Sequence, residues 1–426
     1  MTGTDQSTEQ CARLSGQCRS PVHRKCNSVS SILLLTFVIG LVYLAIGFSS
    51  PLITLYLQEL GASYFQISLI LTTFSAVTLL SNYGWGRISD RFGRRKPILL
   101  FGLSGLAVVY FLLSRAPTAN WAWAIRLMEG VAIAAYVTPS LALMGDLLQH
   151  QGRRGRRMGV YRGVASFMFA GGAFLGGRVA DASSIRTVLS ICAGVYVLAA
   201  ISGLFVRESA PPAPASPGRD EPAAAAPASN PGDETRPLPW IFLAGVLLWT
   251  AAHNAGASMW PNYMAYLGYA KTTLTSLWGL AALVEFPAMA FSGMASDVVG
   301  RAPLLIAGGA TAAVVHIGYL SLAALLPALL AIQVLRGFAF GSFTTTGMTF
   351  AAEWGGQTRR GRNSGVFNAA NGAGGILGAS LGGSIVQIFG FGALYAVCAA
   401  LAVASAICFV VLRKNGRTAE EGMSNE

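Results

Sequence analysis

The segment from Gly86 to Lys96 reads Gly-Arg-Ile-Ser-Asp-Arg-Phe-Gly-Arg-Arg-Lys, and it directly follows an apolar run that extends from Tyr64 to Gly84. Its glycines allow a tight turn and the close approach of neighbouring helices. Asp90 stands among five cations, where it can accept charge-assisted hydrogen bonds or face a helix N-terminus. Bonds of this kind that form in one conformation and break in another make a latch.

A degenerate copy of this segment lies in the second part of the chain, from Gly293 to Arg301. Several matches in the same order would not arise by chance, so we interpret the chain as an internal repeat. The other matches have offsets between 206 and 210 residues and pair Arg153–Arg156 with Arg359–Arg362, Gly172–Gly177 with Gly378–Gly383, and Arg126 with Arg336.

Hydrophobic residues make up 53% of the chain and charged residues only 11%, whereas an ordinary soluble protein has about 25% charged residues. This composition excludes a soluble enzyme and a disordered chain, and it is typical of a protein that crosses a bilayer many times. About 20 residues are needed to cross. We expect twelve spans, at Ser31–Leu57, Tyr64–Gly84, Pro97–Ser114, Trp121–Leu143, Met158–Val179, Thr187–Val206, Trp240–Tyr263, Leu274–Ser296, Pro303–Leu325, Pro327–Phe350, Gly365–Phe389 and Ala393–Leu412.

Residues 207–239 separate six spans from six. They are rich in proline and alanine and have no apolar face, which predicts a solvated linker. Because each half has an even number of spans, the halves are parallel repeats. The predicted fold class is an all-α membrane protein with twelve transmembrane helices in two six-helix bundles. Its expected divisions are a tail at 1–30, bundles at 31–206 and 240–412, the linker between them, and a tail at 413–426.

The loops after spans two, four and ten contain arginine clusters, whereas the alternate loops contain only scattered cations such as Arg115, Arg186 and Lys271. The positive-inside rule places the cation-rich loops, the linker and both termini in the cytoplasm. This pattern explains the net charge of +12 without nucleic acid as a partner. We expect a multi-pass protein of a bacterial inner membrane.

The Gly86–Lys96 segment resembles the signature loop of the major facilitator superfamily, and the span number and break position agree with that family from Ser31 to Leu412. The resemblance implies a monomeric secondary transporter, not an enzyme, whose two bundles rock about a central site. It implies a latch and no catalytic residues. The latch residues would be Gly86, Asp90, Arg91, Gly93 and Arg94, with Asp297 and Arg301 in the second copy, where the loss of most cations makes Asp297 the weaker partner.

Arg126 and Glu129 lie three residues apart within the fourth span, so they share one helical face. An arginine at bilayer depth is expected to face the bundle interior and to be paired. One interpretation is a structural ion pair. The other is proton coupling, because pairing favours the charged carboxylate while desolvation favours the neutral acid. The span resembles a motif whose arginine is associated with proton coupling in exporters.

Glu285 is a further acid inside a span, and no basic residue lies within one helical turn of it. A lone buried carboxyl is expected to be protonated at rest, which makes it a candidate proton carrier. The alternative is a neutral acid that is hydrogen-bonded to a neighbouring helix.

Polar residues inside other spans predict a substrate cavity, because such sites lie near the midplane between the repeats. Taken singly, a polar residue of this kind more often joins two helices or anchors the membrane interface than lines a site. From its span, the resemblance implies that His316 lies outside this cavity. The expected cavity residues are Tyr43, Tyr136, Asn254, Asn262, Gln333, Arg336, Asn368 and Asn371.

Gly172–Gly177 also resembles the antiporter motif of exporters in the family, with Ala173 where that motif has proline. The first hypothesis is therefore proton-coupled efflux of a small organic molecule. The alternative is proton-coupled uptake of a sugar, nucleoside or organic acid. The missing proline favours it, and so does the acid in Glu285-Phe286-Pro287, which resembles the eighth span of some permeases. The sequence contains no metal cluster or nucleotide-binding loop, so we expect no cofactor, no metal and a proton gradient as the energy source. The expected partners are the small-molecule substrate and the lipid bilayer.

Overall fold

A computed structural model describes residues 21–148, 154–206, 237–354 and 356–424, and these contain helices but no strand. The first 20 residues and most of the expected linker lie outside the described residues. The helices are α2 (Pro21–Ser49), η1 (Ser50–Leu52), α3 (Ile53–Glu59), α4 (Tyr64–Phe92), α5 (Lys96–Ser114), α6 (Ala119–Leu148), α7 (Arg154–Ala182), α8 (Ile185–Leu204), α9 (Trp240–Tyr266), α10 (Lys271–Val299), α11 (Arg301–Leu322), α12 (Leu326–Glu353) and α13 (Gly356–Ser424).

Three of the expected spans are not separate straight helices. In the first span, Pro51 lies in η1 between α2 and α3, because proline has no N–H group to continue the helical ladder. The last two spans are both in α13, which bends at Gly390 with φ 81°. Eleven described helices are long and apolar enough to cross a membrane, and the last of them, Gly361–Asn415, has 55 residues. It is long enough to cross twice, so the predicted fold class is confirmed.

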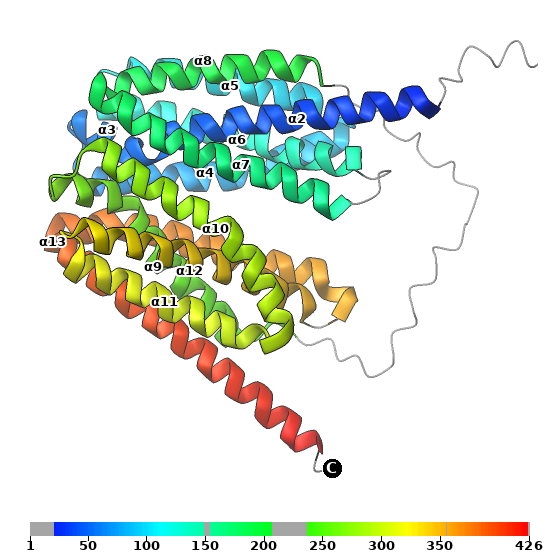
Figure 1. The fold of residues 1–426 in the computed structure, drawn as a ribbon, viewed down its shortest axis with the longest axis vertical. Helices are drawn as coiled ribbons and strands as arrows, with labels where there is room; N and C mark the ends of the chain where they lie inside the picture. The colour runs from blue at the N-terminus through cyan, green and yellow to red at the C-terminus, as the bar shows by residue number, and fades with distance from the viewer. Residues whose placement is uncertain (1–20, 149–153, 207–236, 355, 425–426) are drawn as a thin grey trace, which may run out of the picture.

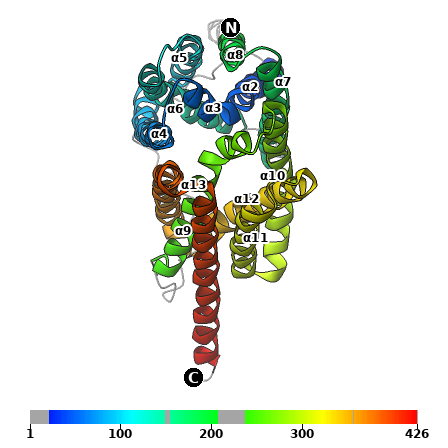
Figure 2. The ribbon, with the colours of Figure 1, turned by 90° about the vertical axis from the view of Figure 1, so that its left-hand side faces the viewer.

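The helices form two bundles, one from α2 to α8 and one from α9 to α13 (Figures 1 and 2). The bundles meet along two seams, α7 against α10 and α4 against α13. These seams are equivalent in the repeat, since α4 matches α10 and α7 matches the first part of α13. The protein therefore has an approximate twofold arrangement about its centre.

The two ends of the bundle differ, and we name them by their connections. The linker face is the end where α8 stops and α9 starts, on the right of Figure 1. The closed end is the opposite end, where α3 meets α4 and α9 meets α10. On the linker face, α4 ends at Gly93 with φ 62° and α10 ends at Gly300 with φ 87°. Both glycines belong to the repeated segment, and both adopt a conformation that glycine reaches without steric strain.

Glycines bring helix backbones into direct contact within each bundle. Gly172 and Gly176 in α7 pack against α2, where a Cβ on Gly176 would lie 2.6 Å from the carbonyl oxygen of Phe48. Gly378 and Gly382 in α13 pack against α9 in the same way. The structure thus gives the repeated glycines a packing role, as small residues have in membrane helices.

Candidate functional site

The first bundle contains a buried polar network centred on α6. Arg126 Nη1 lies 2.5 Å from Glu129 Oε2, and both side chains are 7% exposed. The Tyr110 hydroxyl donates to Glu129 Oε1 at 3.0 Å and also lies 3.0 Å from the Ser49 hydroxyl. The Arg126 guanidinium lies over the ring of Phe74, 4.0 Å from its centroid. The network joins α2, α4, α5 and α6, so the expected ion pair is present and has more partners than the sequence suggested.

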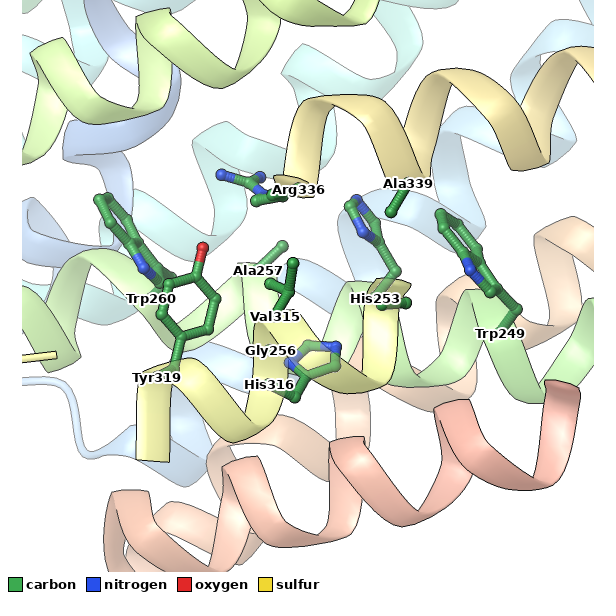
Figure 3. A pocket seen from close by; sticks show the side chains of 11 residues that line it. Trp249, His253, Gly256, Ala257, Trp260, Val315, His316, Tyr319, Arg336 and Ala339 are labelled. Carbon is green, nitrogen blue, oxygen red and sulfur yellow. The ribbon is translucent and has the colours of Figure 1, made fainter. Parts of the chain in front are cut away.

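The second bundle contains a small, partly open pocket between α9, α11 and α12 (Figure 3). Its walls combine aromatic rings, two histidines and one arginine. The lining residues are Trp249, His253, Gly256, Ala257, Trp260, Ala312, Val315, His316, Tyr319, Arg336 and Ala339.

Arg336 is the charged residue of this pocket and is 8% exposed. Its guanidinium lies over the ring of Trp278, 4.3 Å from the centroid, and its Nη1 is 3.4 Å from Gln333 Oε1. The Tyr319 hydroxyl donates to the same Gln333 oxygen at 3.2 Å. Arg336 and Gln333 were both expected in the cavity, and the structure places them together.

Three buried nitrogen atoms around this pocket have no hydrogen-bond partner among the described residues: Trp260 Nε1, His316 Nδ1 and Gln333 Nε2. Buried polar groups are normally satisfied. A cavity beside unpaired polar atoms is therefore suited to a polar ligand.

His316 is 5% exposed and lies on the wall of this pocket, whereas the resemblance implied that it lies outside the cavity. Tyr319 was not predicted either. The sequence contains a signal for both α11 residues, since His316 and Tyr319 are three positions apart and share a helical face.

Glu285 lies in α10, which packs against α7 of the other bundle and against α12. Among the described residues, no hydrogen bond or ion pair engages its carboxyl group. It lies within electrostatic range of Arg336. The prediction of a lone carboxyl group within a span thus agrees with the described residues. The structure adds that this group lies within electrostatic range of the pocket arginine.

The other expected cavity residues occupy several places. Tyr43 in α2 and the fully buried Tyr136 in α6 lie in the first bundle, near Tyr161. Asn254 and Asn371 lie at the contact of α9 and α13, where the Thr250 hydroxyl donates to Asn371 Oδ1 at 2.8 Å.

Asn262 lies at the closed end, because it donates to Gln58 Oε1 at 2.7 Å and to the Thr54 carbonyl oxygen at 3.3 Å. It joins the two bundles there. Asn368 in α13 is exposed. Neither residue lines the pocket in the second bundle.

On the linker face, the second copy of the repeated segment holds a charge network. Arg301 Nη1 lies 2.7 Å from Asp297 Oδ1, and two Arg301 nitrogens donate to Glu353 at 2.9 and 3.0 Å. This bidentate pair ties the start of α11 to the end of α12. In the first copy, Arg95 forms an ion pair with Asp146 at the end of α6.

The first copy differs from the second in what the structure describes. Gly86 lies in α4, Gly93 ends that helix, and the Arg91 and Arg94 side chains are exposed. The Asp90 side chain lies outside the described residues. Asp146 and Glu353 were not predicted, although they are 207 residues apart, the offset of the repeated segment itself.

At the closed end, hydrogen bonds join the bundles at equivalent positions. Asp181, at the end of α7, accepts from the backbone N–H groups of Lys271 and Thr272 at 3.2 and 2.8 Å. Gln387 accepts from the backbone N–H of Tyr64 at 3.1 Å. The Lys271 side chain adds an ion pair with Glu59 at 3.0 Å. We call these contacts the closed-end clamp.

Comparison with known proteins agrees with this architecture. A family model described as Major Facilitator Superfamily matches residues 35–315 and 241–424. A Deinococcus radiodurans protein assigned as a sugar efflux transporter is 28% identical over 386 residues, which cover 87% of this chain and 95% of that protein. The class H tetracycline resistance protein of Pasteurella multocida is 28% identical, over 42% of this chain and 45% of that protein.

Solved structures share the fold at low sequence identity. The nucleoside transporter NupG has a TM-score of 0.75 and 14% identity, over 90% of this chain and 99% of that chain. A bacterial homologue of the human lysosomal transporter Spinster has a TM-score of 0.70 and 15% identity, over 90% of this chain and 96% of that chain.

Proposed function

Because the chain belongs to the Major Facilitator Superfamily, we propose that it exports a small polyhydroxylated molecule of the sugar class in exchange for protons. We place it in a bacterial inner membrane, with both termini in the cytoplasm and the closed end facing outward. The observation that carries the proposal is Glu285, an intramembrane carboxyl group in α10 that has no partner among the described residues and lies within electrostatic range of the pocket arginine.

The coupling role follows from the surroundings of this acid. A carboxyl group without a fixed cation partner can be neutral inside a membrane, and a nearby charge that changes during transport can shift its proton affinity. Glu129 differs, since Arg126 and Tyr110 both engage it. We therefore assign proton exchange to Glu285 and a supporting role to the Arg126–Glu129 pair.

The substrate class follows from the pocket and from the full-length relative assigned to sugar efflux. Sugars present hydroxyl groups to polar side chains and C–H faces to aromatic rings. The pocket provides both kinds of partner: Arg336 and the two histidines are polar, and Trp249, Trp260 and Tyr319 are aromatic. Binding pockets of this kind are mostly apolar, with few placed polar groups.

Two networks at opposite ends would set the conformational cycle. The closed-end clamp holds the bundles together on one side of the membrane, and Asn262 adds to it. The Arg301 and Arg95 pairs on the linker face tie helices within each bundle. Rocking of the bundles would break the clamp while each bundle stays intact, which is a rigid-body transition.

Everted vesicles test this function. With an acidic lumen set in advance, at least one external sugar from a panel of glucose, lactose, glucuronate and glucose 6-phosphate is expected to dissipate the pH gradient when the wild type is present. Glu285→Gln is expected to abolish the pH change but to retain sugar exchange. Glu420→Gln, the same substitution in α13 beyond its membrane-spanning part, serves as control. Unchanged proton movement in Glu285→Gln would remove this residue from coupling, and no sugar response in the wild type would refute the proposed substrate class.

Uptake is the second candidate, favoured by Ala173 in place of the antiporter proline. Ala173 is fully buried and contacts Gly279 across the α7–α10 seam. The same vesicles separate the two directions by sign. A symporter would carry external sugar and protons into the lumen together and acidify it further, whereas an exporter dissipates the gradient.

A further inference from the structure

Each bundle contains one buried arginine that lies over an aromatic ring. Arg126 in α6 lies over Phe74 of α4, and Arg336 in α12 lies over Trp278 of α10. The two arginines match in the repeat, and so do the helices that carry the rings. Each bundle must therefore stabilise a buried arginine charge at an equivalent position.

The balance differs between them. Glu129 neutralises Arg126 from three residues further along the same helix. The residue three positions after Arg336 is Ala339, which is uncharged and lines the pocket. Among the described residues, no carboxylate forms an ion pair with Arg336. Its hydrogen bond to Gln333 goes to the oxygen of a neutral amide. Buried charges in membranes are almost always paired, so a counter-charge for Arg336 has to come from elsewhere.

Glu285 does not supply that counter-charge by contact. It lies seven residues after Trp278 in α10, which is about 10 Å along the helix axis, and it forms no ion pair with Arg336. Its charge acts on Arg336 only at a distance. The cation therefore faces the pocket without a carboxylate at its guanidinium.

The polar atoms beside Arg336 select the kind of ligand. Gln333 Oε1 already accepts from Tyr319 and Arg336, so the Gln333 amide nitrogen is left as a donor, and it has no partner. The indole nitrogen of Trp260 is also a donor without a partner. Both residues are at least 99% buried. Figure 3 shows Arg336, Trp260 and Tyr319 around one end of the pocket. Trp260 and Arg336 both line the pocket, and only an acceptor can satisfy an indole N–H and a guanidinium together.

We propose that the transported solute carries an oxyanion group, a carboxylate or a phosphate, and that Arg336 binds it in this pocket. A guanidinium binds either group with two parallel hydrogen bonds, and the buried setting strengthens such charge-assisted bonds. The inference rests on the proposed function, because it names the charge of the same sugar-class solute: a sugar acid or a sugar phosphate.

Binding of matched probes to the purified full-length protein in nanodiscs tests the inference. D-glucose is the neutral probe, D-glucuronate and D-glucose 6-phosphate carry the two oxyanions, D-glucosamine carries the opposite charge, and benzoate is an acid without a sugar ring. The variants are Arg336→Gln and Arg336→Lys. The control is Arg115→Gln, because Arg115 also lies over an aromatic ring, Phe111, but is exposed and outside the pocket.

We expect one or both oxyanion sugars to bind the wild type at least tenfold more tightly than glucose. Arg336→Gln is expected to remove this difference, Arg336→Lys to restore part of it, and Arg115→Gln to leave it unchanged. The two oxyanion probes tell a carboxylate site from a phosphate site.

The other outcomes divide clearly. Equal affinity for glucose and the charged sugars, or a charge preference that survives Arg336→Gln, overturns the inference and leaves sugar export standing. Arg336-dependent binding of benzoate without any sugar sustains the anion site and overturns the sugar class. The inference is wrong if no probe binds. It is also wrong if chloride is the only anion whose binding becomes weaker in Arg336→Gln.

Discussion

Asp181 and Gln387 occupy equivalent positions 206 residues apart, and each accepts hydrogen bonds from backbone N–H groups at the start of a helix in the other bundle. The neighbouring contacts repeat too, since Gly177 packs against Thr275 and the Gly383 N–H donates to Ser68 Oγ at 2.5 Å. The closed-end clamp is therefore built twice, once with a charged acceptor and once with a neutral one.

Asp181→Ala is expected to open the closed end more often, because two N–H groups at the start of α10 lose their acceptor. Loss of such a cap costs about 1 kcal/mol, which corresponds to about a fivefold shift in population. The labelling rate of Ala62→Cys, a 6% exposed position at that end, would report the opening once the native cysteines are replaced. Ser183→Ala is the control, since its hydroxyl bonds only to its own helix. Equal labelling rates in both variants would contradict the role of the clamp.

Glu129→Gln is expected to destabilise the first bundle strongly, because it leaves the Arg126 charge buried and unpaired. Removing one partner of a buried pair costs about 3–5 kcal/mol. Thermal unfolding in nanodiscs measures the effect. Glu59→Gln breaks the exposed pair with Lys271 and is expected to cost less than about 1 kcal/mol. Similar unfolding temperatures for the two variants would mean that the buried pair contributes little.

Tyr110→Phe removes one hydrogen bond to the Glu129 carboxylate and the contact with Ser49. Since hydrogen bonds to charged groups contribute about 1.5–3 kcal/mol, we expect an intermediate loss of thermal stability. A double-mutant cycle with Glu129→Gln should be non-additive, because both changes act on the same carboxylate. Additive effects would separate Tyr110 from the network.

Gly172→Ala and Gly171→Ala form a matched pair of adjacent substitutions. A Cβ on Gly172 would collide with the Leu44 carbonyl oxygen of α2, whereas a Cβ on Gly171 meets nothing within 4 Å. Overpacking costs about 1–3 kcal/mol, so Gly172→Ala is expected to lower the unfolding temperature and Gly171→Ala to leave it nearly unchanged. Equal stability would show that α2 and α7 can separate without penalty.

Glu353→Gln is expected to slow turnover while binding is retained, because it weakens the bidentate pair between α12 and Arg301. Asp297→Asn should have a smaller effect, since Asp297 contributes one contact and is 70% exposed. Exchange rates and binding constants for the transported sugar, measured on the same preparations, separate the two effects. A change confined to affinity would place Glu353 in binding instead.

The sequence predicts the fold class well because its signals are local. Apolar runs of about 20 residues indicate the spans, and the nearly constant offset between matching motifs indicates the internal repeat. The Arg126–Glu129 pair is also local, since three residues on one helix fix the geometry. Gln333 and Arg336 meet for the same reason.

The remainder of the site depends on which helices face each other. Tyr110 and Ser49 reach Glu129 from other helices, and no spacing within α6 indicates them. Asn262 is polar and lies in a span, yet its height along α9 puts it in the closed-end clamp. The family resemblance of its span implied that His316 lies outside the cavity, whereas it lines the pocket in the second bundle. The side that a helix turns inward depends on its neighbours, which the sequence does not give. Asp146 and Glu353 could have been found by extending the 207-residue offset beyond the motif.

The glycine contacts between α2 and α7, and between α9 and α13, have a mechanical consequence. Backbones in direct contact leave no flexible side chains between them, so each pair resists shear and behaves as a stiff beam. α7 has 29 residues and is therefore about 44 Å long. A tilt that parts its tip from α10 by a few ångströms would swing its other tip by a similar distance in the opposite sense. The hydrogen bonds of Asp181 and Gln387 at the closed end therefore also limit how far the helices move at the linker face.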